Sequence, residues 1–420
     1  MSKCCGNGKK ANAKQCDPCA PPSVECGSVK QSTGASDCPL AYFENMIDNC
    51  YDYAVEAKAN GMPIVGIMCE FASRELIMAA GGVPVCLCGG SAKTIPAAEE
   101  HLPSNLCPLI KSTYGYHIEK KNPFLEMADL IVAETTCDGK KKMFELMAES
   151  RPVYVMELPQ KQDDPDAFQH WVCELEKLKL RLEEQFGVQI TDCKLKSAIE
   201  VMNRERSLRR NLAEMMAGDD PPLTGRELLQ FKSSISGIPA DFEQYEKALS
   251  MFSGKSRVKD SKSRVRILMT GVPTVHGAER VVEIVENHGG QIVCMENCTG
   301  IKPIIDDIDP NAPDLIQAVA EKYFNIHCAV MTKNNRRMEV IRELAKKYRA
   351  ECIVDLIWQG CTTYDIESFY VKKLAEEELG IPYLRIETDY SPSDSARIAV
   401  RVEALFETVK SNAHHLTTCG

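Results

Sequence analysis

Short apolar runs alternate with helix-like segments in two separate parts of the chain, and this alternation restricts the fold more than any other feature. In the first part, the runs lie at 63–68, 83–87, 130–133 and 153–156. In the second part, they lie at 265–269, 291–295, 352–357 and 383–386. Continuous apolar strands separated by helices are typical of parallel sheets covered on both faces. The sequence therefore predicts an α/β fold with two doubly wound, Rossmann-like parallel-sheet domains.

The segment between these parts has a helical pattern. Large apolar residues from Phe168 to Phe186 recur at steps of three and four residues, as on one helix face. Thr224 and Glu227 have the spacing of a capping box. The first 40 residues are rich in Gly, Ser, Lys and Pro and cannot bury a core. We therefore expect four parts: a Cys-rich flexible arm (1–40), an N-terminal α/β domain (41–163), a helical connector (164–253) and a C-terminal α/β domain (254–420).

The charge balance excludes several functions. The chain carries 50 Lys and Arg residues against 60 Asp and Glu residues, a net charge of −10 at pH 7. Binding to nucleic acid or to a membrane surface would need clustered positive charge. No stretch approaches the ~20 apolar residues of a membrane span, and no apolar secretory segment is visible at the N-terminus. We expect a cytoplasmic protein that binds neither nucleic acid nor membranes.

The chain has 20 cysteines, which is unusual for a cytoplasmic protein. In a reducing compartment, that number indicates metal binding or redox chemistry more often than disulfides. Individual cysteines can also be small buried apolar residues. We interpret six in this way, as core or surface residues: Cys50, Cys86, Cys173, Cys193, Cys294 and Cys352. The arm holds six more, including a CxxC pair at Cys16 and Cys19, but lacks the regular spacing of a zinc module.

Five further cysteines fall where predicted strands end: Cys69, Cys88, Cys137, Cys298 and Cys361. Open α/β sheets bind ligands outside the carboxyl ends of their strands, where helix N-termini favour thiolate over thiol. Cys107 and Cys328 lie in connections on the same side of the predicted sheets. We therefore predict a thiolate-lined cleft between the domains. It could hold an iron–sulfur cluster or zinc, and the absence of paired CxxC knuckles speaks against zinc.

Six segments carry a resemblance to a known family. They are Met68-Cys-Glu-Phe-Ala-Ser-Arg-Glu-Leu-Ile, Leu102-Pro-Ser-Asn-Leu-Cys-Pro-Leu-Ile-Lys-Ser, Glu134-Thr-Thr-Cys-Asp-Gly-Lys-Lys-Lys-Met, Met295-Glu-Asn-Cys-Thr-Gly, Gly360-Cys-Thr-Thr-Tyr and Ile386-Glu-Thr-Asp-Tyr-Ser. From about Ala41 to Val409, the chain resembles the iron–sulfur component of the 2-hydroxyacyl-CoA dehydratase and benzoyl-CoA reductase family. Within that family it is most similar to the double-cubane cluster proteins.

The resemblance implies a set of cluster ligands. The three cysteines that the family shares match Cys107, Cys137 and Cys361, which in dehydratases hold one [4Fe–4S] cluster with an open iron for the substrate. The double-cubane branch holds two cubanes joined by a sulfide, [8Fe–9S], and needs three more thiolates. Four cysteines match, and we favour Cys69, Cys298 and Cys328 because they surround the cleft from both domains. Cys88 is the alternative.

The resemblance also implies a partner and two competing activities. Family members receive electrons from a separate ATP-hydrolysing reductase that has its own [4Fe–4S] cluster, and we expect the same here, with this chain as a homodimer. The chain lacks a Gly-x-x-x-x-Gly-Lys-Ser/Thr loop of its own. The favoured activity is ATP-dependent, low-potential reduction of small molecules. The alternatives are a 2-hydroxyacyl-CoA dehydratase subunit with one [4Fe–4S] cluster and a cluster carrier without catalysis.

Candidate catalytic groups other than cysteine are weaker. Lys111 and Glu134 flank candidate ligands and could donate to sulfides or orient thiolates, and His276 could move protons because imidazole titrates near neutral pH. Each residue of this kind is more often structural. The basic run from Lys140 to Lys142 is most simply an exposed helix face.

Overall fold

The computed structural model describes residues 38–254, 258 and 261–418. Five of the six arm cysteines, up to Cys26, lie outside these residues. The first helix, α1 (Pro39–Glu44), begins within the stretch predicted as a flexible arm, with Pro39 in the first turn, where a missing N–H has no cost. No helix within the described ranges is both long enough and apolar enough to cross a membrane.

The N-terminal sheet contains four parallel strands in the order β2-β1-β3-β4. They are β1 (Ile64–Ile67), β2 (Val83–Cys86), β3 (Leu130–Glu134) and β4 (Val153–Met156). Every residue of β1 and β3 is buried, as expected for strands covered on both faces. The helices around this sheet are α2 (Met46–Ala59), α3 (Arg74–Ala79), α4 (Ile95–Ala98), α5 (Pro108–Glu119), α6 (Pro123–Met127) and α7 (Asp138–Ala148).

The C-terminal sheet repeats this arrangement with the order β6-β5-β7-β8. Its strands are β5 (Val265–Gly271), β6 (Gly290–Glu296), β7 (Cys352–Trp358) and β8 (Tyr383–Thr388). The helices are α12 (Arg280–Asn287), α13 (Leu315–Phe324), α14 (Asn335–Lys347), α15 (Thr362–Lys373) and α16 (Ser395–Thr418). All eight predicted strands are present, and the α/β fold with two parallel sheets is confirmed.

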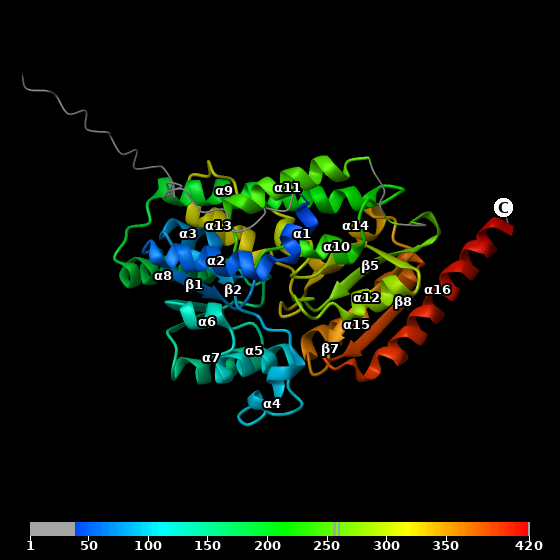
Figure 1. Ribbon diagram of the computed structural model, residues 1–420, viewed down its shortest axis with the longest axis horizontal. Helices are drawn as coiled ribbons and strands as arrows, with labels where there is room; N and C mark the ends of the chain where they lie inside the picture. The colour runs from blue at the N-terminus through cyan, green and yellow to red at the C-terminus, as the bar shows by residue number, and fades with distance from the viewer. Residues whose placement is uncertain (1–37, 255–257, 259–260, 419–420) are drawn as a thin grey trace, which may run out of the picture.

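Helices join the two sheets. They are α8 (Ala167–Phe186), α9 (Asp192–Glu214), α10 (Gly225–Gln230) and α11 (Pro239–Phe252), and Figure 1 shows α9 and α11 along one side of the molecule. Helix α9 contacts α3 of the N-terminal part and the short helix η4 (Lys302–Ile304) of the C-terminal part. The predicted capping box is present at the start of α10, where Thr224 and Glu227 bond each other's backbone. The connector therefore packs against both the N-terminal and the C-terminal part of the chain.

One predicted helix is shorter than its pattern indicates. The residues over 71–80 have a helical pattern, but α3 begins only at Arg74. Ser73 caps it, accepting a hydrogen bond from the Leu76 amide at 3.2 Å. Residues 70–73 before it are buried in a turn and bend, so their apolar character reflects burial and not helical periodicity.

Asp241 on α11 predicts a pH-dependent stability. Its carboxylate is 4% exposed and accepts a hydrogen bond from Tyr42 Oη at 2.9 Å. Burial raises its pKa from 3.8 to about 7. Between these values the folded chain holds a proton that the unfolded chain has lost, so the free energy of unfolding should fall as pH rises from about 4 to about 7, by up to about 4 kcal/mol. In urea unfolding across this range, Asp241→Asn should lose this slope; an unchanged slope would contradict the assignment.

Candidate functional site

The strand orders of the two sheets place the site. In the first sheet β1 lies between β2 and β3, and in the second β5 lies between β6 and β7. The strand order therefore changes direction next to β1 and next to β5. Ligands of open α/β sheets bind at the carboxyl ends of the strands at such a point. Cys69 follows β1 and Cys137 follows β3, while Cys298 follows β6 and Cys361 follows β7. The predicted strand-end cysteines therefore lie at the binding edges of both sheets.

Cys107, Cys137 and Cys361, the first trio, share a local structure. Each is the N-cap residue of a helix of 11 or 12 residues: α5, α7 and α15, respectively. The partial positive charge of a helix N-terminus stabilises thiolate. A hydrogen bond from Cys361 lowers the pKa of Cys107 and raises that of Cys361. The two domains thus bring these two thiols into contact, with Cys137 close enough to interact with both.

Gly360 allows this contact. Its φ is +74°, and a Cβ at this position would lie 2.5 Å from the Asn105 carbonyl oxygen and 3.3 Å from the Cys107 amide nitrogen. A side chain here would therefore separate the turn before Cys361 from the loop before Cys107.

Gly360→Ala should accordingly destabilise the protein by more than backbone strain alone. Gly61 is a matched control, because its φ is +78° but nothing lies within 4 Å of the position of a Cβ. We expect Gly61→Ala to lower the free energy of unfolding by about 1 kcal/mol and Gly360→Ala by about 2–4 kcal/mol, measured by urea unfolding. Equal losses in both variants would show that the close approach has no energetic consequence.

Cys69, Cys298 and Cys328, the second trio, lie close to one another. Burial raises the pKa of Cys69 well above its ordinary value, and the Cys298 and Cys328 thiols raise it further. Burial, together with Cys328, raises the pKa of Cys298 to about 12. Cys328 also interacts with Cys137, which connects the two trios.

Cys88 has a different environment. Its thiol donates a hydrogen bond to the Met68 carbonyl oxygen at 3.3 Å. The principal charged neighbours of this thiol are Lys140, Cys86 and Glu70, none of which is a candidate ligand. Cys88 thus shares Lys140 with Cys69, but no candidate ligand is among these principal neighbours.

Three lysines lie among the thiols. Lys140 donates to the Met68 carbonyl oxygen at 2.8 Å, and although burial disfavours its charge, Cys69 and Cys88 raise its pKa well above the ordinary value. Lys232 donates to the Cys298 carbonyl oxygen at 2.8 Å, and Lys302 lies 3.0 Å from Glu296. The prediction that Lys140 lies on an exposed helix face is wrong, because the start of α7 turns this side chain toward the cysteines. Only Lys141 and Lys142 are exposed.

The three candidate groups other than cysteine occupy different environments. Glu134, at the end of β3, is fully buried, and neither of its carboxylate oxygens has a hydrogen-bond partner within the described residues. Burial raises its pKa to about 8. Lys111 donates to Glu99 and to the Ser104 carbonyl oxygen, at 2.7 and 2.6 Å, so it holds the loop before Cys107. His276 is exposed.

A cavity of about 580 Å³ lies against the second trio. Cys69, Cys88 and Cys298 line it, as does His276, so both domains contribute. It is large enough to admit a small organic molecule to the thiols.

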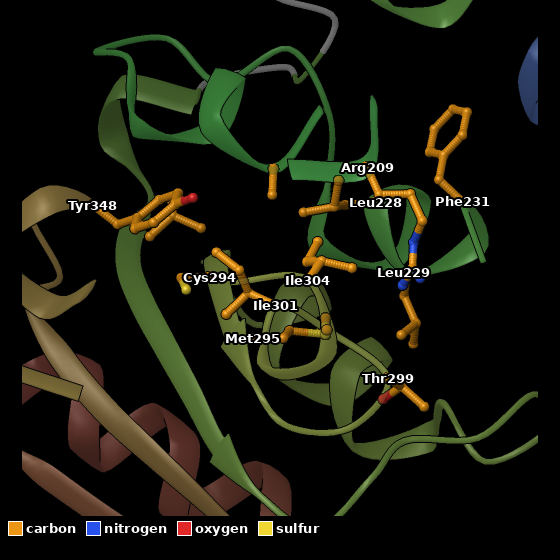
Figure 2. A pocket seen from close by; sticks show the side chains of 13 residues that line it. Arg209, Leu228, Leu229, Phe231, Cys294, Met295, Thr299, Ile301, Ile304 and Tyr348 are labelled. Carbon is orange, nitrogen blue, oxygen red and sulfur yellow. The ribbon is translucent and has the colours of Figure 1, made fainter. Parts of the chain in front are cut away.

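A second, smaller cavity lies behind β6 and is shown in Figure 2. It measures about 40 Å³ and is lined mainly by apolar side chains, with Cys294 and Tyr348 on its walls. Burial raises the pKa of Cys294. This environment fits the interpretation of Cys294 as a core residue.

The six favoured cysteines offer sulfur donors to a metal cluster. Across 38–254, 258 and 261–418, no three His, Cys, Asp or Glu side chains form a group that could hold one metal ion. In an iron–sulfur cluster each cysteine thiolate binds a different iron, so the thiols need not converge on one point. Six sulfur donors with lysines among them fit an anionic iron–sulfur cluster.

Two parallel α/β sheets with cysteines at their strand ends define a two-domain protein with a thiol-rich site between the domains. The family model of the 2-hydroxyglutaryl-CoA dehydratase D-component matches residues 69–409. The chain therefore belongs to this family, as the segments around its cysteines predict.

Several curated proteins are similar. A putative dehydratase subunit, YjiM, of Escherichia coli (strain K12) is 39% identical over 84% of this chain and 93% of its own length. The (R)-phenyllactyl-CoA dehydratase beta subunit of Clostridium sporogenes is 22% identical over 87% of this chain and 97% of its own. A benzoyl-CoA reductase subunit of Thauera aromatica is 28% identical over 34% of this chain and 38% of its own. The relatives thus include subunits of both dehydratases and a reductase.

Proposed function

We propose that this chain is the iron–sulfur catalytic component of a low-potential reductase that acts on small molecules. In this proposal the first trio (Cys107, Cys137 and Cys361) holds one cubane of an [8Fe–9S] double cubane, and the second trio holds the other. The observation that supports it is the pair of thiol trios at the binding edges of the two sheets, close enough for Cys328 of one trio to raise the pKa of Cys137 of the other. When bound, the cluster would store electrons and transfer them to substrate.

The other residues of the site would serve this centre. Lys140, Lys232 and Lys302 bring positive charge near the thiols, which offsets the negative charge of six thiolates. The cavity of about 580 Å³ would admit the substrate beside Cys69 and Cys298. His276 lines the same cavity and is exposed, so it could exchange protons with solvent.

The second candidate is a 2-hydroxyacyl-CoA dehydratase subunit with one [4Fe–4S] cluster on the first trio. The dehydratase relatives favour it. A second cubane would occupy the space beside the open iron where a dehydratase binds its thioester. Whether the second trio holds a cubane therefore distinguishes the two candidate functions.

Iron and acid-labile sulfide should be measured per chain on anaerobically purified protein. A variant with serine at the five cysteines of residues 1–37 removes the contribution of that segment. We expect about eight irons per chain. About four would replace the reductase proposal by the dehydratase, to be tested by acyl-CoA dehydration, and zinc without iron would exclude both.

We also propose a separate ATP-hydrolysing [4Fe–4S] reductase as electron donor, and a cytoplasmic homodimer as the working form. Substrate turnover should require both the reductase and ATP. Turnover in the absence of both would contradict the donor, and a monomer in sedimentation experiments would contradict the homodimer.

A further inference from the structure

The connector segment between α10 and α11 carries one of the three lysines of the site. Phe231 at its start is 3% exposed, and its ring packs against that of Phe43 with the centroids 5.1 Å apart. Further along, Ile235 forms an antiparallel bridge with Val85 of β2. These two contacts fix the backbone on either side of Lys232. The Lys232 side chain is 17% exposed and lies in the wall of the cavity of about 580 Å³.

Lys232 forms hydrogen bonds to both domains. Its Nζ donates to a Glu70 carboxylate oxygen at 3.2 Å and to the Cys298 carbonyl oxygen at 2.8 Å. Glu70 directly follows Cys69 in the N-terminal part, whereas Cys298 lies in a turn after β6 in the C-terminal part. A hydrogen bond from a charged donor is roughly twice as strong as one between neutral groups. One ammonium group therefore connects the backbone at Cys298 to the residue after Cys69.

Each of the two turns is also held within its own domain. Arg74 lies 2.8 Å from the other carboxylate oxygen of Glu70, and both side chains are buried. On the C-terminal side, Asn297 Nδ2 donates to the Val272 carbonyl oxygen at 3.3 Å. Loss of the Lys232 side chain would therefore leave Glu70 paired and each turn attached to its own sheet. It would remove this connection between the domains.

We propose that Lys232 is a positioning residue, which holds Cys69 and Cys298 next to each other so that the second trio can bind its half of the cluster. The identity of the cluster rests on the proposed function, but the connection between the two turns does not. Without Lys232, part of the free energy of cluster binding would be needed to bring the turns together. The second trio would then hold iron less tightly, whereas the first trio would be unaffected.

The first test uses the full chain after anaerobic removal of iron, with dibromobimane, a short reagent that joins two neighbouring thiols. Peptide mass spectrometry measures the yield of the cross-link between Cys69 and Cys298. We expect Lys232→Met to lower this yield about tenfold, because both hydrogen bonds are lost. Lys232→Arg should retain the cross-link, since a guanidinium keeps the charge and the donors.

The second test uses the iron-loaded protein and an iron chelator. About half of the iron should leave Lys232→Met roughly tenfold faster than it leaves the parent protein, and the other half at the parent's rate. If the parent holds only about four irons per chain, the reductase proposal fails, whereas the cross-link still determines whether Lys232 positions the two cysteines.

Lys196→Met is the matched control. Lys196 lies on α9 of the connector and also bonds the C-terminal part, donating to Asn311 Oδ1 at 2.8 Å, but neither side chain lines the cavity. Its cross-link yield should equal that of the parent. Circular dichroism identifies the variants that fold, and Lys232→Gln, which is one atom shorter and uncharged, replaces Lys232→Met if the latter does not. An unchanged cross-link without the Lys232 ammonium group, or an equal loss in Lys196→Met, would overturn the proposal.

Discussion

Replacing Cys298 with serine should halve the iron content of the protein, from about eight atoms per chain to about four. Serine supplies no thiolate, so the second trio would keep only Cys69 and Cys328, while the first trio would remain complete. Reduction of small molecules should be lost at the same time. Iron analysis on anaerobically purified protein, with circular dichroism as a check on folding, measures the effect.

Cys88→Ser is the matched control for this prediction. Cys88 lines the same cavity and also follows a strand of a binding edge, but its thiol bonds the Met68 carbonyl oxygen. Its loss should leave the iron content unchanged. If Cys88→Ser had half the iron content and Cys298→Ser had the full content, Cys88 would be the ligand in place of Cys298, and our assignment would be wrong.

Replacing Glu296 with glutamine should lower the free energy of unfolding by about 3–5 kcal/mol. The fully buried Glu296 carboxylate lies 3.0 Å from Lys302 Nζ, 3.3 Å from Arg337 Nε and 3.0 Å from His327 Nε2. Although burial opposes it, the charges of Lys302 and Arg337 hold the pKa of this carboxyl well below its usual range. Glutamine would leave both cations buried without their common counter-charge. Urea unfolding followed by circular dichroism, on samples of matched iron content, measures the loss.

Glu378→Gln provides the comparison. Its carboxylate pairs with Arg342 at 2.7 Å, but both side chains are partly exposed, and such pairs contribute only about 0–1 kcal/mol. We expect a loss of less than about 1 kcal/mol in this variant. A similar small loss in Glu296→Gln would show that the buried network does not stabilise the fold.

The strands could be predicted from the sequence because a parallel sheet buries both faces, which leaves continuous apolar runs such as 130–133. The cysteines at the binding edges could be predicted for the same reason, since each follows such a run. The inward position of Lys140 could not be predicted. The sequence does not show which residue of the basic run 140–142 points inward, because the packing of α7 determines it.

The six candidate ligands divide evenly between the two halves of the chain. Cys69, Cys107 and Cys137 belong to the first sheet and its connections, whereas Cys298, Cys328 and Cys361 belong to the second. Neither half could complete either trio alone, because each trio takes residues from both. Both halves would thus have to be synthesised and in contact before iron could bind. The bound cluster would then act as a cross-link between the two halves. Removal of the iron by a chelator would then remove this cross-link. The connector α8–α11 would remain as the principal structural connection between the sheets.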